Sequence, residues 1–230
     1  MLKIENIEVL GWEAAIRGMR NPMNSWDKSD SLLISYMFCD EIEELELAKI
    51  CGGSAPIIRE NDLSLMRRLA NAGTDHRKFM RMITVYVDIT APLYWWKEFD
   101  TYKVGTVANS CSTMHKIHDK EFTLDDFSCE HLVSTGFSSV QLLEQIVHVL
   151  NYARNMFLET KDKAWWWQMS QLLPSSYNQK RTVMLNYEVL ANIYKSRKNH
   201  KLDEWHTFCD FVEGLPYAKE LICYGKRNTD

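Results

Sequence analysis

A run of small hydroxyl and amide side chains around Gly105 is the first part of this chain that could carry chemistry. It follows a segment, residues 97–103, in which aromatic and charged residues are mixed. Glycine lets a ligand approach the backbone closely, and hydroxyl, amide and backbone N–H groups can donate hydrogen bonds to a phosphate or a base. A polar helix-to-loop transition that satisfies its own backbone groups would have the same composition. The candidate donors are Thr106, Asn109, Ser110 and Ser112.

Asn186 and Arg197 form a second candidate pair within residues 182–198, a segment that we expect to be helical. They are separated by about three helical turns, so both would share one stripe with Leu190 and Ile193 between them. An apolar stripe bounded by an amide and a guanidinium can hold a flat ring while the arginine binds an anion or a carbonyl. Alternatively, Arg197 lies in solvent at the helix C-terminus, where the helix dipole favours a cation.

Other kinds of catalytic site have little support. His115 and His118 lie close together, but no third ligand follows at the spacing of a zinc site, so we expect no metal. The six cysteines form no Cys-x-x-Cys pair and carry no nucleophile signature, which favours reduced thiols in a cytoplasm. The Gly-x-Gly-x-x-Gly and Gly-x-x-x-x-Gly-Lys-[Ser/Thr] loops are absent, which excludes the commonest dinucleotide-binding and nucleotide-triphosphatase classes.

The composition predicts one compact, soluble and cytoplasmic domain over residues 1–230. Hydrophobic residues make up 46% and aromatic residues 12%, with only nine glycines and five prolines, which excludes a disordered or repetitive chain. The 27 lysines and arginines against 31 acidic residues give a net charge of −4, so no general positive field attracts nucleic-acid polymers or anionic membranes. No run approaches the roughly 18 apolar residues of a membrane span, and no signal peptide is recognisable.

The periodicity of apolar residues predicts the elements that must position these candidates. Apolar residues at Ile4, Ile7, Val9 and Leu10 predict a strand over residues 4–10. A period of two predicts another strand over residues 81–89, followed by a helix with Thr90 as cap and Pro92 in its first turn. The expected helices span residues 12–19, 40–50, 61–72, 91–103, 163–172, 182–198 and 203–213, with a long helix capped by Ser138. We therefore expect an α+β fold with a small, mostly antiparallel sheet and a largely helical remainder.

Eight tryptophans are unusual in a chain of this length, and five of them form two clusters. We expect one of Trp95 and Trp96 to anchor a helix in the core and the other to face a ligand or a neighbouring subunit. Three consecutive helical residues span about 200°, so Trp165, Trp166 and Trp167 cannot all face one core. At least one should meet another surface, which is typical of an oligomer.

The candidates, taken in order, resemble the flavin-dependent thymidylate synthases, the ThyX family, over most of the chain. The family pattern is a helix, His-x-Ser-Pro-Phe-Glu-His, a strand, and a helix entering Arg-His-Arg-x-x-Ser-x-Asn-Glu-x-Ser-x-Arg-Tyr. Here the corresponding course runs through Ala70–His76, a strand to Ile89, and Thr101–Lys103 leading into Thr106–Ser112. Towards the C-terminus the family shows Arg-x-x-Leu-Pro, then Asn and, eleven residues beyond it, Arg. The matching residues are Leu173, Pro174, Asn186 and Arg197.

The resemblance implies a homotetramer with active sites between subunits that bind FAD, NADPH, methylenetetrahydrofolate and dUMP. In that family reduced flavin delivers a methylene group and then a hydride to C5 of the pyrimidine, without an obligatory enzyme nucleophile. By resemblance, Tyr102, Lys103 and Asn186 lie beside the flavin, and Thr106, Asn109, Ser110, Ser112 and Arg197 lie beside the nucleotide.

Arginines of the family pattern are replaced at several positions. Arg-His-Arg stands as Thr101–Lys103, the later arginine of that motif as Thr113, and the arginine before Leu-Pro as Ser170. Each replacement removes a charge-assisted contact of about 1.5 to 3 kcal/mol. Three such losses together exceed about 4 kcal/mol, which is roughly a thousandfold in affinity. The cations that could compensate are Lys97, Lys103, Lys116, Lys180 and Arg181.

The sequence is therefore compatible with two alternative functions. The first is a diverged flavin-dependent enzyme that transfers a methyl or hydroxymethyl group to C5 of a pyrimidine nucleotide such as dUMP. The second is a non-catalytic oligomer that binds or sequesters a nucleotide on the same scaffold. A partner-binding protein that uses its aromatic clusters is a third possibility, against which the stripe with Asn186 and Arg197 favours a ligand pocket.

Overall fold

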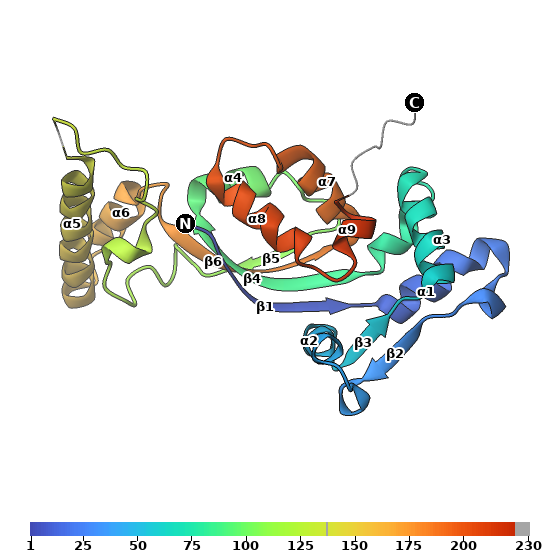
Figure 1. Cartoon of the computed structure of the whole chain (residues 1–230). Helices are drawn as coiled ribbons and strands as arrows, with labels where there is room; N and C mark the ends of the chain where they lie inside the picture. The colour runs from blue at the N-terminus through green and yellow to red at the C-terminus, as the bar shows by residue number, and fades with distance from the viewer. Residues whose placement is uncertain (137, 224–230) are drawn as a thin grey trace. The chain divides into compact units, whose positions relative to one another are not determined.

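The computed structural model describes residues 1–136 and 138–223, and the chain divides into two compact units (Figure 1). The first unit comprises residues 1–3, 89–101 and 109–181. The second comprises residues 4–88, 102–108 and the described chain from residue 182 onward. The expectation of one domain over residues 1–230 stays a prediction.

Helices and two small sheets alternate along the chain, which confirms the α+β class. The described helices are α1 (Trp12–Arg20), α2 (Ile42–Ile50), α3 (Glu60–Asn71), α4 (Leu93–Phe99), α5 (Ser139–Thr160), α6 (Lys163–Leu172), α7 (Tyr187–Arg197), α8 (Asp203–Glu213) and α9 (Ala218–Leu221). The strands are β1 (Lys3–Leu10), β2 (Leu32–Ser35), β3 (Ser54–Ile57), β4 (Thr84–Pro92), β5 (Val107–Ser110) and β6 (Asn178–Asn186). Short 3₁₀ helices are η1 (Asn21–Met23), η2 (Trp26–Lys28), η3 (Tyr36–Phe38), η4 (Arg77–Arg81) and η5 (Leu124–Asp126). One sheet has the strand order β1-β4-β6-β5, and β2 pairs with β3 in antiparallel register.

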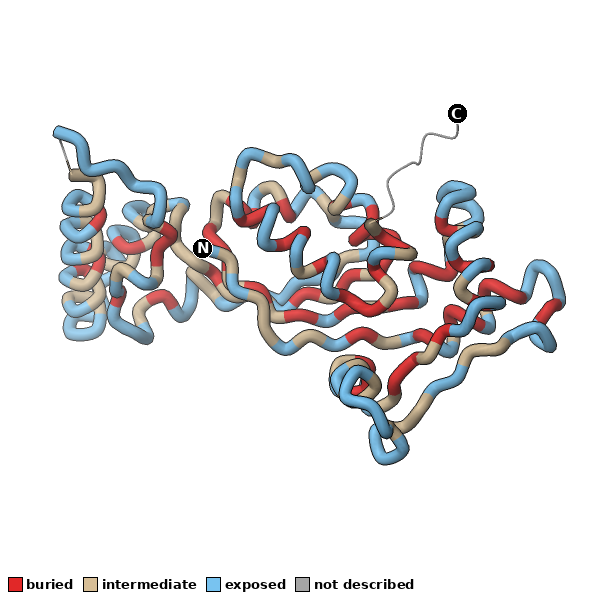
Figure 2. The backbone as a smooth tube through the Cα atoms, viewed as in Figure 1, coloured by how far each residue is buried: buried red, intermediate tan, exposed pale blue. Residues whose placement is uncertain are grey.

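Alternating apolar residues build the part of the four-stranded sheet that belongs to the second unit. In β4, Val85 and Val87 are buried whereas Tyr86 between them is exposed, and in β6 Val183 and Leu185 are fully buried. Such alternation places one face of each strand in the core. Helices α7 and α8 cover one face of this sheet, where buried residues gather (Figures 1 and 2). Their largest fully buried side chains are Tyr187, Trp205 and Phe208.

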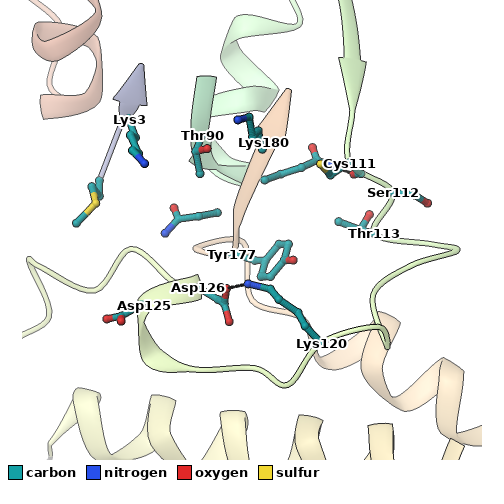
Figure 3. A pocket seen from close by; sticks show the side chains of 13 residues that line it. Lys3, Thr90, Cys111, Ser112, Thr113, Lys120, Asp125, Asp126, Tyr177 and Lys180 are labelled. Carbon is teal, nitrogen blue, oxygen red and sulfur yellow. Dashed lines mark hydrogen bonds and ion pairs between the residues drawn. The ribbon is translucent and has the colours of Figure 1, made fainter. Parts of the chain in front are cut away.

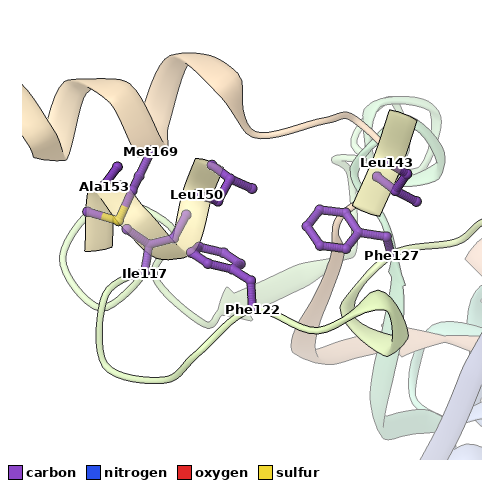
Figure 4. Packing of buried hydrophobic residues seen from close by; sticks show 7 residues of the cluster. All are labelled: Ile117, Phe122, Phe127, Leu143, Leu150, Ala153 and Met169. Atoms are coloured by element: carbon purple, nitrogen blue, oxygen red, sulfur yellow. The ribbon is translucent and has the colours of Figure 1, made fainter. Parts of the chain in front are cut away.

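The first unit has its own small core beneath α5 and α6 (Figure 4). Ser138 caps α5 by accepting a hydrogen bond from the Gln141 N–H, and Asp162 caps α6 by accepting one from Ala164 N–H at 2.9 Å. Lys161 takes a left-handed conformation, with φ of 58°, that ends α5 and allows the chain to reverse. The buried residues of this core are Ile117, Phe122, Phe127, Leu143, Leu150, Ala153 and Met169.

The helix predicted over residues 91–103 is wrong at both ends. Strand β4 continues to Pro92, because the N–H groups of Leu93 and Tyr94 donate to the carbonyls of Tyr177 and Ser175, both at 3.0 Å. Thr90 therefore lies in the strand and caps nothing. Helix α4 ends at Phe99, after which the chain turns, so Tyr102 and Lys103 lie beyond the helix.

The helix predicted over residues 182–198 is also wrong in its first turn. Residues up to Asn186 belong to β6, and α7 begins at Tyr187. The Asn186 side chain caps α7 by accepting a 3.1 Å hydrogen bond from the Val189 N–H. Asn186 and Arg197 consequently do not share a helical stripe. Burial of Val183 and Leu185 in the sheet explains why the strand displaces the first helical turn.

Several other predicted strands and helices agree with the structure. The strand over residues 4–10 and the helices over residues 163–172 and 203–213 are confirmed, whereas α2 begins at Ile42 and β4 at Thr84.

Trp95 and Trp96 are both buried, which corrects the expectation that one of them faces outward. Of the C-terminal cluster, Trp167 is 46% exposed. Among the described residues, no helix has the length and apolar content needed to span a membrane.

Candidate functional site

A cavity of about 350 Å³ lies within the first unit (Figure 3). Lys3, Thr90 and Lys180 reach it from the neighbouring strands β1, β4 and β6. Residues 111–113, directly after β5, and residues 120–126 supply the other walls. Drug-sized ligands usually occupy cavities of about 300 to 1,000 Å³, so this volume suits a small ligand. The complete lining is Met1, Lys3, Thr90, Cys111, Ser112, Thr113, Lys120, Asp125, Asp126, Tyr177, Asn178, Gln179 and Lys180.

The cavity wall carries three lysines and two aspartates. The Lys120 ammonium donates to the Asp126 carboxylate, and this bond raises the pKa of Lys120. Asp126 also accepts a 2.9 Å hydrogen bond from the Thr123 N–H, so its carboxylate is held by its own loop. The lining therefore contains one lysine more than it has aspartates. The wall is thus weakly cationic.

Hydroxyl groups lie on the side of the cavity formed by residues 111–113 and Tyr177. The Ser112 oxygen accepts hydrogen bonds from the N–H groups of Met114 at 3.2 Å and His115 at 2.8 Å. These bonds fix the turn and leave the Ser112 hydroxyl proton available for donation. Burial is the largest cause of the raised pKa of Tyr177, and the negative charge of Asp126 raises this pKa further. The Tyr177 phenol is therefore neutral at pH 7.

Arg181 lies next to the cavity wall and contacts its residue Gln179. Its NH1 donates to Asp100 at 2.7 Å, its Nε donates to Gln179 Oε1 at 3.0 Å, and its guanidinium lies 4.1 Å from the Trp96 ring centre. The Gln179 side-chain amide in turn donates to the Cys111 carbonyl at 2.8 Å. Arg181 therefore positions the wall through Gln179.

The second unit holds most of the other predicted site residues. Arg197 Nε donates a 2.8 Å hydrogen bond to the Tyr102 hydroxyl, and its guanidinium lies 4.7 Å from the Trp205 ring centre. Lys103 is exposed. The Thr106 hydroxyl oxygen is buried and has no hydrogen-bond partner within the described chain. Arg197 therefore has packing partners that the solvent-facing alternative did not anticipate.

Gly105 fixes how the polar run meets α7. Its φ of +78° lies in the left-handed region, and a Cβ there would lie 2.9 Å from Asn186 Nδ2 and 3.1 Å from Val189 Cγ2. Only glycine permits both this backbone conformation and this contact at low cost. The sequence suggested that another group approaches the backbone closely at Gly105. In the structure, the start of α7 makes this approach.

Each predicted residue now has a place. Ser112 lines the cavity of the first unit, and Asn109 and Ser110 are exposed on β5 in the same unit. The residues placed in the second unit are Tyr102, Lys103, Thr106, Asn186 and Arg197.

Several of the cavity-lining residues were not predicted from the sequence as site residues. Lys3, Thr90 and Tyr177 come from segments far apart in the sequence, and only strand pairing brings them together. Tyr177 and Asn178 follow the Leu173-Pro174 pair at the start of β6, where a polar end on an otherwise apolar strand was the available signal. Outside the cavity, the Ser170 hydroxyl oxygen is buried and has no hydrogen-bond partner in the described chain.

Solved structures provide the decisive comparison. The chain is similar to ThyX from Helicobacter pylori with FAD and dUMP, with a TM-score of 0.62, 16% identity and coverage of 94% of this chain and 97% of that one. The chain has a ThyX-like fold. A second H. pylori ThyX complex with FAD and dUMP matches the ThyX-like fold with a TM-score of 0.60, at 14% identity and with 96% and 97% coverage. The UMP/dUMP methylase PolB from Streptomyces cacaoi, bound with 5-Br dUMP, also has a TM-score of 0.60, at 12% identity and with 98% and 95% coverage. No family model and no curated protein sequence matches the chain.

The residues that we expected beside a flavin, Tyr102, Lys103 and Asn186, do not suit FAD well within one chain. The Tyr102 hydroxyl accepts from Arg197, and the Asn186 side-chain oxygen caps α7. The exposed Lys103 supplies one ammonium where the family motif carries Arg-His-Arg, although FAD has two phosphates. These three side chains thus provide less charge and fewer uncommitted polar groups than the flavin requires.

Proposed function

We propose that this protein binds a pyrimidine nucleoside monophosphate, such as dUMP, in the cavity of the first unit. The observation that carries the proposal is the meeting of Lys3, Lys180 and Ser112 around a cavity of about 350 Å³. Similar folds solved with dUMP or 5-Br dUMP support the choice of a pyrimidine nucleotide. Nucleotide binding or sequestering, rather than catalysis, is the function that the side chains of this chain support best.

The two kinds of donor in the cavity suit the two ends of such a nucleotide. The Lys3 and Lys180 ammonium groups and the Ser112 hydroxyl can bind phosphate oxygens. The Asn178 side-chain amide offers both a donor and an acceptor, as the N3–H and carbonyl edge of uracil requires, and the Tyr177 ring adds an apolar surface. A weakly cationic wall matches a monophosphate better than a polyanion.

Titration calorimetry with dUMP tests this function. We expect Lys180→Met to weaken dUMP binding about tenfold, since a lost charge-assisted hydrogen bond costs about 1.5 kcal/mol. Lys219→Met removes an exposed lysine of the second unit and serves as the matched control, with unchanged affinity expected. Equal dUMP affinity of the two variants, or no binding at about 1 mM dUMP, would reject the cavity as the nucleotide site.

Cys111 offers an independent readout, because its exposed thiol lines the same cavity. Bound dUMP should slow alkylation of Cys111, as measured by mass spectrometry of its peptide. Cys39 lies in the second unit and supplies the internal reference, whose rate should not change. Slowing at both cysteines would indicate a general effect on the protein instead of a ligand in the cavity.

Flavin-dependent transfer of a methyl or hydroxymethyl group to C5 is the second candidate, favoured by FAD in two similar structures. NADPH and methylenetetrahydrofolate would then be the reductant and the one-carbon donor. Reconstitution with excess FAD, followed by absorbance spectroscopy and thermal unfolding, separates the candidates. Absent flavin bands and an unchanged melting temperature would reject this enzyme reading and leave nucleotide binding intact.

A homotetramer belongs to the same proposal. Much of α5 is exposed (Figure 2), and large apolar side chains lie on the outer faces of α5 and α6. Several large apolar side chains exposed on neighbouring helices are typical of a surface that contacts another molecule. Sedimentation velocity measures the assembly directly, and a monomer at working concentration would contradict the tetramer. The exposed large apolar residues of α5 and α6 are Leu142, Val149, Tyr152, Leu158, Trp167 and Leu172.

A further inference from the structure

The short segment between β2 and α2 exposes an unusual amount of apolar surface in the second unit. We call Tyr36, Met37, Phe38 and Ile42 the η3 patch. Met37 is 85% exposed, Phe38 74%, Ile42 78% and Tyr36 45%. Single exposed apolar residues are common on proteins, but four within seven positions are not, and such patches mark interaction sites.

The backbone holds these side chains outward in a defined turn. The Tyr36 N–H donates to the Gly53 carbonyl at 2.8 Å, and the Cys39 N–H donates to the Tyr36 carbonyl at 3.4 Å. The Cys39 thiol adds a contact of 3.5 Å to the Ser35 carbonyl. The apolar exposure of the η3 patch is thus a property of a hydrogen-bonded structure.

A rim of negative charge adjoins the patch. Asp40, Glu41, Glu43 and Glu44 lie within or directly after it, and in the chain as described none of them forms an ion pair with a basic side chain. By contrast, Glu46 further along α2 pairs with Lys49 at 2.5 Å. Four carboxylates without cationic partners in the described chain adjoin an apolar cluster, which is the pattern that a basic and apolar partner would complement.

We propose that the η3 patch is a docking surface for a basic amphipathic segment of a partner protein. Apolar side chains of the partner would cover Met37, Phe38 and Ile42, and its lysines or arginines would pair with the acidic rim. The rim repels an anionic lipid surface, which disfavours membrane binding. It also disfavours docking of the patch onto the same patch of a second copy, because the carboxylates would face each other.

A labelled synthetic peptide tests the proposal with the full-length chain. The probe is an amphipathic helix of about 18 residues, with leucines on one face and lysines on the other. Its comparison peptide carries glutamate at every lysine position. Fluorescence anisotropy should show saturable binding of the lysine peptide that weakens as salt is added, and at least tenfold weaker binding of the glutamate peptide.

Two sets of substitutions assign the binding to the patch. Met37→Asp combined with Phe38→Asp should weaken binding at least tenfold, and Glu43→Lys combined with Glu44→Lys should do the same while leaving the apolar centre intact. Val133→Asp, at a residue of the first unit that is 62% exposed, is the matched control. Thermal unfolding of each variant verifies that it is folded.

Three results would overturn the proposal. The first is equal binding of both peptides, and the second is unchanged binding by the Met37 and Phe38 double variant. The third is loss of a homo-oligomer in that double variant by sedimentation, which would assign the patch to a second copy of the chain. All three are independent of dUMP binding, so the nucleotide proposal stands or falls separately.

Discussion

Arg197 and Tyr102 are joined by a 2.8 Å hydrogen bond from the guanidinium Nε to the phenol oxygen. The guanidinium also lies 5.6 Å from the Tyr102 ring centre and 4.7 Å from that of Trp205. Residue 197 ends α7, whereas residue 102 begins the polar run around Gly105. The pair therefore ties that run to the helical layer of the second unit, which is a structural role additional to any ligand contact.

Replacement of Arg197 by alanine should lower the free energy of unfolding by about 1 to 3 kcal/mol, because a charge-assisted hydrogen bond and two cation–π contacts are lost. Tyr102→Phe removes only the hydrogen bond and should cost about 1 kcal/mol. Urea denaturation at pH 7 measures both. If Arg197 also binds the nucleotide, dUMP affinity should fall by about 1.5 to 3 kcal/mol in the alanine variant. Unchanged affinity would confine Arg197 to the structural role.

Gly105→Ala should destabilise the protein more than Gly73→Ala. Both glycines have positive φ, of 78° and 105°, so both substitutions incur backbone strain of about 1 to 3 kcal/mol. Only at Gly105 would the new Cβ also press on Asn186 and Val189, whereas nothing lies within 4 Å of it at Gly73. Thermal or urea unfolding of the two variants isolates the contact. Equal destabilisation would show that Asn186 moves aside without cost.

Asp62 should make stability fall at acid pH. Arg20 Nε donates to its carboxylate at 2.7 Å, and the Ser29 hydroxyl and Ser31 N–H donate at 2.8 and 3.0 Å. Burial alone would raise the pKa of Asp62, but these hydrogen bonds outweigh it and hold the pKa below 3.8. A carboxyl with a lowered pKa stabilises the fold fully above its unfolded pKa, and the contribution is lost as pH falls through the folded value.

Asp62→Asn tests this dependence. The variant leaves Arg20 buried without its carboxylate, so we expect a loss of about 3 to 5 kcal/mol at pH 7. The difference between native protein and variant should shrink as pH drops below about 4, because the Asp62 carboxyl of the unfolded chain takes up a proton there and the native carboxylate follows at lower pH. Urea denaturation between pH 7 and pH 2.5 measures it. A difference that stays constant over this range would contradict the assigned role.

Leu150→Ala should destabilise the first unit by about 2 to 5 kcal/mol, because Leu150 is fully buried in its small core (Figure 4). Leu158 lies on the same helix but is 38% exposed, so Leu158→Ala should cost clearly less. Denaturation followed by tryptophan fluorescence compares the two. Similar costs would mean that α5 is buried on both faces in the assembled protein.

Much of the fold follows from local sequence signals. The apolar residues within residues 4–10 predict β1, and the sequence also predicts α6 and α8 with their observed ends. The cap at Ser138 works as its sequence suggests. The order of motifs also indicated the ThyX-like fold, although identity to the similar solved structures is only 12 to 16%. These features depend on neighbours in the chain, which a sequence displays directly.

The sequence by itself determined the helical and strand periods and the α+β class, and it named Ser112 as a candidate donor before the structure placed that residue in the cavity lining. Only the tertiary structure decided that Val183 and Leu185 belong to a strand, because their burial in the sheet outweighs the helical pattern that predicted a helix over residues 182–198. It also decided that Arg181 stacks on Trp96 behind the cavity, and that Lys3, Thr90 and Lys180 meet across neighbouring strands. Such contacts join residues far apart in the chain, and strand pairing, not local spacing, sets their distances.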